Sequence, residues 1–204
     1  MKGYPNFNNF GEYLYWSYAN LQMYYAALKM HLSEYDQLCY IIRAKYYKRY
    51  KDGVYHITDL FRFNEFKLKA DNKYCWYCGK EVSSADDLTM DHIFPKSKGG
   101  DNSIDNIFLV CKTCNSSKKD KDLIDWFFEK YEFIPMYFVT HYLKLIYLFA
   151  EKHELMGKHR EELEKMDLPF NINNIRIHPY DLPTQDEYAD EEFFPVLWRE
   201  DCDI

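Results

Sequence analysis

Residues 75–119 read CWYCGKEVSSADDLTMDHIFPKSKGGDNSIDNIFLVCKTCNSSKK. The stretch opens with one Cys-x-x-Cys pair, Cys75 and Cys78, and carries a second, Cys111 and Cys114, near its end. One such turn directs two thiolates at a single point, and two turns complete the tetrahedral ligand set of structural zinc. We therefore predict one Zn²⁺ ion held by all four cysteines. A redox dithiol formed by one pair alone is the alternative.

The segment between the cysteine pairs has 32 residues, more than a plain zinc ribbon needs. Its pattern predicts a short strand over 88–93, a loop that contains Pro95 and Gly99-Gly100, and a second strand over 106–110. Such short strands bury too little apolar surface to fold alone, whereas structural zinc contributes about 10–16 kcal/mol of binding free energy. Because four sulfurs leave no position for water, this ion is expected to be structural rather than catalytic.

The residues before the cysteine stretch predict two helices over 11–51. Apolar residues recur there at spacings of three and four, which is typical of one helix face: Leu14, Tyr18, Leu21, Tyr25, Leu28 and Leu32. Ser33 and Asp36 form an imperfect capping box before the second helix, which ends at Asp52-Gly53 in a basic run. We interpret the two helices as a hairpin that packs on the core. The alternatives are that the basic end of the second helix faces DNA or that the helices form a dimer interface. A further short helix is expected near Thr58-Asp59.

The residues after the second strand predict further helices. One begins at Asn115 or Ser116 and buries three apolar residues, which are Leu123, Trp126 and Phe127. A second covers 135–156, begun by Pro135 and ended by Gly157, and a shorter one covers 158–166. Residues 181–204 carry nine Asp and Glu against one Arg, so we expect a flexible or docking tail.

The net charge of −7 is unevenly distributed. Residues 1–72 carry +3, residues 73–121 carry +1 and residues 122–204 carry −11. This balance neither supports nor excludes a nucleic-acid partner, although it argues against a strong non-specific coating of DNA.

The sequence shows no pattern of a signal peptide and no apolar run long enough to cross a membrane, so a cytoplasmic protein is expected. In such a compartment, paired cysteines more often bind a metal than form disulfides. Cys39 and Cys202 have no partner at ligand spacing, and we expect both to be ordinary thiols.

The ordered set of motifs resembles the HNH endonuclease family. The motifs are Cys75-x-x-Cys78, Asp91-His92-Ile93-x-Pro95, Lys98-Gly99-Gly100, Asn106 and Cys111-x-x-Cys114-Asn115, followed by Lys118. The order is most similar to the zinc-bearing branch typified by phage endonuclease VII, in which Asn follows the last cysteine. The resemblance covers about residues 75–125 and neither flank. It implies a ββα-metal finger that cuts phosphodiester bonds with one catalytic divalent ion and leaves 5′-phosphate and 3′-hydroxyl ends.

The resemblance also implies roles for four residues. His92 would be the general base that activates water, and Asn106 would orient the loop that carries His92. Asp91 and Asn115 would hold the catalytic ion. Many relatives have His where Asn115 stands, so this site would have only oxygen ligands and would favour Mg²⁺ or Mn²⁺.

Elementary chemistry agrees with these residue types. Hydrolysis needs a deprotonated water and positive charge near the phosphate, and imidazole accepts a proton near pH 7. Neighbouring strand residues point to opposite faces, so Asp91 and His92 share a site only where the strand ends or twists. Simpler roles are a turn cap for Asp91, a satisfied polar residue for His92 and a helix cap for Asn115. Lysines that could bind phosphate, or that form a solvated surface, crowd the segment: Lys96, Lys98, Lys112, Lys118, Lys119 and Lys121. The remaining histidines are expected on helix surfaces or in loops: His31, His56, His141, His153, His159 and His178.

We therefore expect an α+β protein, a small zinc-stapled ββα-metal nuclease finger embedded between N-terminal and C-terminal helices. Its parts are a helical region over 1–72, the finger over 73–130, a second helical region over 131–180 and the acidic tail over 181–204. The expected activity is metal-dependent hydrolysis of DNA, with Lys96, Lys98, Lys118 and Lys119 on the nucleic acid. A finger with one ion cuts one strand, so a double-strand break needs a homodimer or two successive nicks. Two alternatives are a nuclease subunit of an ATPase-licensed antiphage defence complex and a non-catalytic zinc-dependent DNA-binding or adaptor module.

Overall fold

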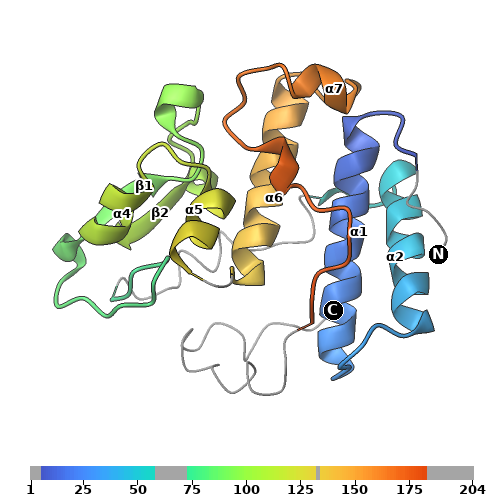
Figure 1. The fold of residues 1–204 in the computed structure, drawn as a ribbon, viewed down its shortest axis with the longest axis horizontal. Coiled ribbons are helices and arrows are strands. Elements are labelled where there is room, and N and C mark those ends of the chain that lie inside the picture. Colours follow the sequence, from blue (N-terminus) through green and yellow to red (C-terminus); the bar gives the residue numbers. More distant parts are fainter. Residues whose placement is uncertain (1–5, 58–72, 132–133, 183–204) are drawn as a thin grey trace.

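Helix α1 (Phe10–Lys29) is the helix around which the N-terminal part of the chain packs. The computed structural model describes residues 6–57, 73–131 and 134–182 (Figure 1). Asn9 caps α1 by accepting a hydrogen bond from the backbone N–H of Glu12 at 2.9 Å. Leu14, Tyr18 and Leu21 are buried as predicted, but buried residues occur on every side of the helix. α1 is therefore a central helix rather than an amphipathic surface helix.

Helix α2 (Gln37–Lys51) forms the second half of the predicted hairpin and lies along α1. The predicted capping box is wrong, because Asp36 is itself the N-cap and accepts from the N–H of Cys39 at 2.9 Å. Cys39 is a buried free thiol, and Arg43 places its guanidinium 4.4 Å from the centre of the Trp16 ring. α2 therefore packs along α1, and its exposed side carries apolar as well as charged residues, including Leu38 and Ile41.

The two predicted strands pair as an antiparallel hairpin, β1 (Leu88–His92) and β2 (Ile107–Cys111). Asp91 lies opposite Phe108 and His92 lies opposite Ile107. Helix α4 (Lys112–Lys118) follows directly and contacts both strands. The order is strand, strand, helix, which confirms the predicted fold class of a small ββα finger among helices.

The helix predicted to run from Asn115 past Phe127 is two helices. α4 ends at Lys118, where Lys119 has a φ of +52°, and α5 (Leu123–Lys130) begins after Asp122. Asp122 caps α5 by accepting from the N–H of Ile124 at 2.9 Å. Asn115 lies inside α4 and does not cap it, because the helix must start early enough to turn Cys114 toward the other cysteines.

Helix α6 (Met136–Lys152) stands between the finger and α1 (Figure 1). It starts after Pro135 as predicted but ends before Gly157, since Glu154 adopts a φ of +56° and the N–H of Leu155 closes on the carbonyl of Ala150 at 2.8 Å. α7 (Arg160–Leu163) is shorter than predicted.

One aromatic core joins the finger to the helices. The ring of Phe138 on α6 lies 5.6 Å from that of Tyr77, 5.5 Å from that of Phe108 and 4.8 Å from that of Phe127. His141, on the same helix, is fully buried rather than on the helix surface as predicted. The finger is therefore supported on one side by α6.

No helix within residues 6–57, 73–131 and 134–182 is both long and apolar enough to cross a membrane. The helix predicted near Thr58-Asp59, the tail beyond Leu182 and Cys202 lie outside the described residues.

Candidate metal centre and catalytic strand

The four cysteines of the two pairs converge, and their sulfur atoms all lie within 4.8 Å of one another. The Sγ atoms of Cys78 and Cys111 are 4.0 Å apart. A tetrahedron with Zn–S bonds of about 2.3 Å has sulfurs roughly 3.8 Å apart, so the cluster has the size that Zn²⁺ needs. Cys75 and Cys78 come from the turn before the hairpin, while Cys111 ends β2 and Cys114 lies in the first turn of α4. The donor set fits the predicted zinc.

Contacts within the cluster also shift the pKa values of its cysteines. A hydrogen bond from Cys114 lowers the pKa of the Cys75 thiol to about 4, and the same bond, with burial, raises the pKa of Cys114. Hydrogen bonding within the cluster thus favours the thiolate of Cys75 and the thiol of Cys114. A divalent ion among them would stabilise all four thiolates.

Asp91, near the end of β1, has a buried carboxylate with two partners. Its Oδ2 atom accepts a hydrogen bond from the Tyr77 hydroxyl at 2.6 Å and lies 3.0 Å from the Lys118 ammonium. Asp91 is 4% exposed and Lys118 is fully buried. Burial raises the pKa of Tyr77 well above its ordinary value, with Asp91 adding to the effect, so the phenol remains a donor. Both partners act on Oδ2, and Oδ1 is the remaining oxygen.

Lys118 also fixes the backbone of the neighbouring residue. Its Nζ atom donates to the carbonyl oxygen of His92 at 2.8 Å. The ammonium thus has two acceptors, which offset the desolvation of a buried charge. Lys118 does not lie on the surface, where the predicted phosphate contact would place it. Lys96, Lys98 and Lys119 are exposed.

Asn115 contacts the same strand from the preceding turn of α4. Its Nδ2 atom donates to Thr89 Oγ1 at 2.9 Å and to the carbonyl of Met90 at 3.4 Å. Residues three apart on a helix share a face, so Asn115 and Lys118 both meet β1. The structure brings Asn115 and Asp91 to the same side of the hairpin.

The His92 side chain is only partly buried and has a different partner. Its Nε2 atom lies 2.9 Å from Oδ1 of Asn102, in the loop between the strands. Among the described residues, no hydrogen bond joins the imidazole to Asp91 or Asn115. This agrees with the alternation of side chains along a strand.

Asn106 holds the loop that follows His92. Its Oδ1 atom accepts from the N–H of Phe94 at 2.8 Å, and its Nδ2 atom donates to the carbonyls of Phe94 at 3.0 Å and Asp101 at 2.8 Å. A Cβ atom on Gly100 would lie 1.8 Å from the Phe94 carbonyl oxygen, so only glycine fits there. Gly99 has a φ of +89°. The loop therefore combines a close backbone approach at Gly100 with a left-handed turn at Gly99.

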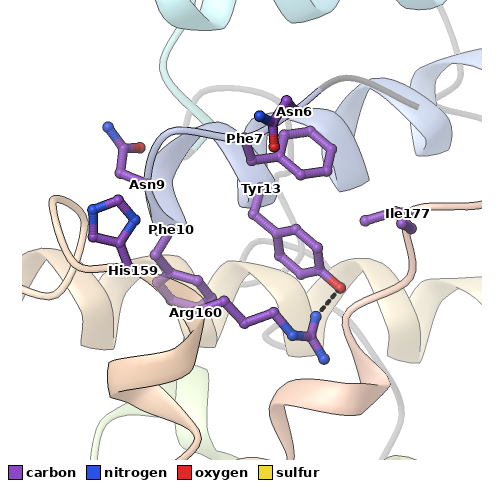
Figure 2. A pocket seen from close by; sticks show the side chains of 8 residues that line it. All are labelled: Asn6, Phe7, Asn9, Phe10, Tyr13, His159, Arg160 and Ile177. Atoms are coloured by element: carbon purple, nitrogen blue, oxygen red, sulfur yellow. Dashed lines mark hydrogen bonds between the residues drawn. The ribbon is translucent and has the colours of Figure 1, made fainter. Parts of the chain in front are cut away.

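A surface pocket of about 510 Å³ lies between the start of α1 and α7, outside the finger (Figure 2). Its most polar side chain, Arg160, already hydrogen-bonds to Tyr13, to Glu164 at 2.8 Å and to Asn173 at 2.7 Å. None of the predicted site residues lines this pocket.

A family model described as HNH endonuclease matches residues 75–129. These residues are an HNH endonuclease domain. A CRISPR-associated endonuclease Cas9 from Corynebacterium diphtheriae is 33% identical over 70 residues, which are 34% of this chain and 6% of that protein. The chain therefore matches only a small part of that relative. No solved structure matches the chain.

Sequence reasoning missed two members of the HNH domain's polar network. Tyr77 is one of the two residues between the first pair of cysteines, where no pattern distinguishes a buried donor from a spacer. Asn102 lies ten residues beyond His92 in an exposed loop. The contact of Lys118 with β1 could have been predicted from the sequence. Lys118 follows Asn115 by three positions, and residues three apart on a helix share a face.

Proposed function

We propose that the HNH domain hydrolyses DNA phosphodiester bonds in a metal-dependent reaction, with His92 as general base. The observation that carries the proposal is the end of β1, where a partly exposed imidazole directly follows a buried carboxylate in a segment matched to HNH endonucleases. Phosphodiester hydrolysis requires these two functions, a proton acceptor and an anionic ligand, at one phosphate.

His92 would accept the proton of the attacking water through Nδ1. An amide oxygen only accepts hydrogen bonds, so the contact with Asn102 Oδ1 assigns the ring proton to Nε2. Nδ1 is then the nitrogen with a free lone pair. Lys118, bound to the His92 carbonyl, and Asn106, bound to Phe94, hold the backbone at His92 and directly after it.

Asp91 and Asn115 would hold the catalytic ion through their Oδ1 atoms. Oδ2 of Asp91 and Nδ2 of Asn115 are used by protein contacts, and two hard oxygen donors on one side of β1 suit Mg²⁺ or Mn²⁺. When bound, such an ion supplies positive charge for the phosphate and the leaving oxygen. Lys96, Lys98 and Lys119 are exposed and would contact the DNA backbone.

The decisive experiment is a cleavage assay with Mg²⁺ or Mn²⁺ on linear, supercoiled, branched and single-stranded DNA. His92→Ala should lose cleavage by at least about 100-fold, the usual size of a general-base contribution, while DNA binding is retained. His56→Ala, which changes an exposed histidine after α2 and outside residues 75–129, is the matched control and should cleave like the parent. Cleavage that survives in His92→Ala would remove the base assignment.

A second candidate is a non-catalytic zinc-dependent DNA-binding or adaptor module. The ion pair between Asp91 and Lys118 favours it, because the carboxylate already has a cation as partner. In that case the parent protein binds DNA without cutting it under every metal condition. A nuclease subunit that needs an ATPase partner, as in antiphage defence, would instead start cutting when the partner is added.

A further inference from the structure

We infer that helix α6, outside the HNH domain, supplies two positioning residues for His92. Lys144 and His141 both bind Asp105, in the turn Ile104–Asn106 before β2, and together the three form the α6–Asp105 clamp. The inference rests on the proposed function, because it assigns the clamp to the loop that holds the general base. Neither α6 residue lies within residues 75–129, the range of the family match.

The clamp consists of two contacts to different parts of Asp105. The Lys144 ammonium lies 2.8 Å from the Asp105 carboxylate, and its side chain is 9% exposed. The Nε2 atom of His141 donates to the backbone carbonyl of Asp105 at 2.6 Å, and His141 is fully buried. One residue of the loop is therefore fixed at both its side chain and its backbone.

Asp105 is next to the residue that organises the His92 loop. Asn106 binds the N–H and the carbonyl of Phe94 through its side chain. Its own carbonyl accepts from the N–H of Ile93 at 2.9 Å. Ile93 follows His92 directly, so a displacement of Asp105 would be transmitted to His92 through two residues.

The loop needs such an anchor because its outer side faces solvent. Residues 101–104 are exposed, including 45% of Ile104. α6 is instead a 17-residue helix buried on several faces and anchored by Phe138 and Tyr142. Functional side chains are placed most accurately when rigid elements support them. The clamp ties the exposed loop to the most buried helix near it.

Removing the ion pair should reduce turnover rather than substrate binding. Lys144→Met keeps the length of the side chain and removes its charge, and Lys144→Arg restores the charge. A misplacement of about 1 Å costs up to roughly 100-fold in rate. We expect kcat of Lys144→Met to fall by about 10- to 100-fold with little change in KM, and Lys144→Arg to recover most of it. Lys158→Met changes a partly exposed lysine that pairs with Glu162, outside residues 75–129, and should behave like the parent.

A double-mutant cycle separates positioning from general stability. If Lys144 acts through His92, then Lys144→Met should add no further loss in the His92→Ala background. An equal loss in both backgrounds would overturn the inference, as would a Lys144→Met protein with full kcat.

Amide hydrogen exchange tests the clamp without relying on activity. In Lys144→Met, the N–H groups of Ile93 and Phe94 should exchange at least about tenfold faster, while β1–β2 amides such as those of Phe108 and Val110 stay protected. Unchanged exchange at Ile93 and Phe94 would overturn the inference even if the enzyme is active. A parent protein that never cuts DNA but shows the exchange difference would disprove the proposed function and keep the clamp.

Discussion

The helical body, which consists of α1, α2, α6 and α7, and the HNH domain share one aromatic core but differ in how much they depend on polar contacts. In the body, α1, α2 and α6 bury large apolar side chains such as Phe10, Leu14 and Leu21, each fully excluded from solvent. The HNH domain shares the aromatic core through Tyr77 and Phe108, but its two strands of five residues also depend on a cysteine cluster, a buried ion pair and the bonds of Asn106. The helical body should therefore tolerate the loss of one contact. In the HNH domain, removal of any one of these polar groups should disrupt the geometry of the site.

Removing the zinc that we propose for the four cysteines should destabilise the HNH domain more than any other change. Cys78→Ser, or treatment with a strong chelator, should unfold the HNH domain, since structural zinc contributes about 10–16 kcal/mol. Zinc content and hydrogen exchange at β1 and β2 measure the loss, and the amides of α1 should remain protected. Cys39→Ala, which removes a buried thiol of the helical body, should keep its zinc. Protection of β1 without bound zinc would contradict the assigned role of the cluster.

Breaking the buried ion pair between Lys118 and Asp91 should have the second-largest effect on stability. Lys118→Met leaves the Asp91 carboxylate buried with Tyr77 as its donor and should cost about 3–5 kcal/mol of unfolding free energy. Lys121→Met removes a lysine from an exposed pair with Glu129 and should cost at most about 1 kcal/mol. Urea denaturation of the two variants gives the comparison, and equal costs would show that burial of Lys118 has no energetic importance.

A cavity in the helical body should have a smaller effect on function than on stability. Leu21→Ala removes a fully buried side chain of α1 and should cost about 3 kcal/mol. Zinc content and the hydrogen exchange of β1 should stay as in the parent below the melting transition. Loss of zinc from the folded variant would show that the two regions do not differ as described.

A single added methyl group in the His92 loop should have the smallest effect on stability. Gly100→Ala places a Cβ atom 1.8 Å from the Phe94 carbonyl, so the loop must shift, at a cost of roughly 2 kcal/mol. Cleavage should fall more than stability does, because the shift lies beside the proposed base. Gly157→Ala meets no atom within 4 Å and is the control. Equal activity of the two variants would place the loop outside the site.

The sequence predicted the HNH domain better than its connections to the helices. Cysteine spacing determined the cluster because a metal imposes its own geometry, and the strands were correct within one residue at each end. The break between α4 and α5 was missed because apolar spacing reports buried faces and not the positive φ of Lys119. Lys118 is one of a run of charged residues that is typical of a surface. The contacts of Asp105 with α6 join residues 36 and 39 positions apart, and no local pattern reports them.

Tyr77 belongs at once to the first cysteine turn, the aromatic core and the Asp91 carboxylate. If the cysteines hold zinc as proposed, a newly made chain without its ion would lack a fixed phenol to align that acid. Metal binding by the cysteines and alignment of the Asp91 carboxylate on β1 would then occur in one step. Under the proposed function, the supply of zinc would then decide when the domain becomes able to cut DNA.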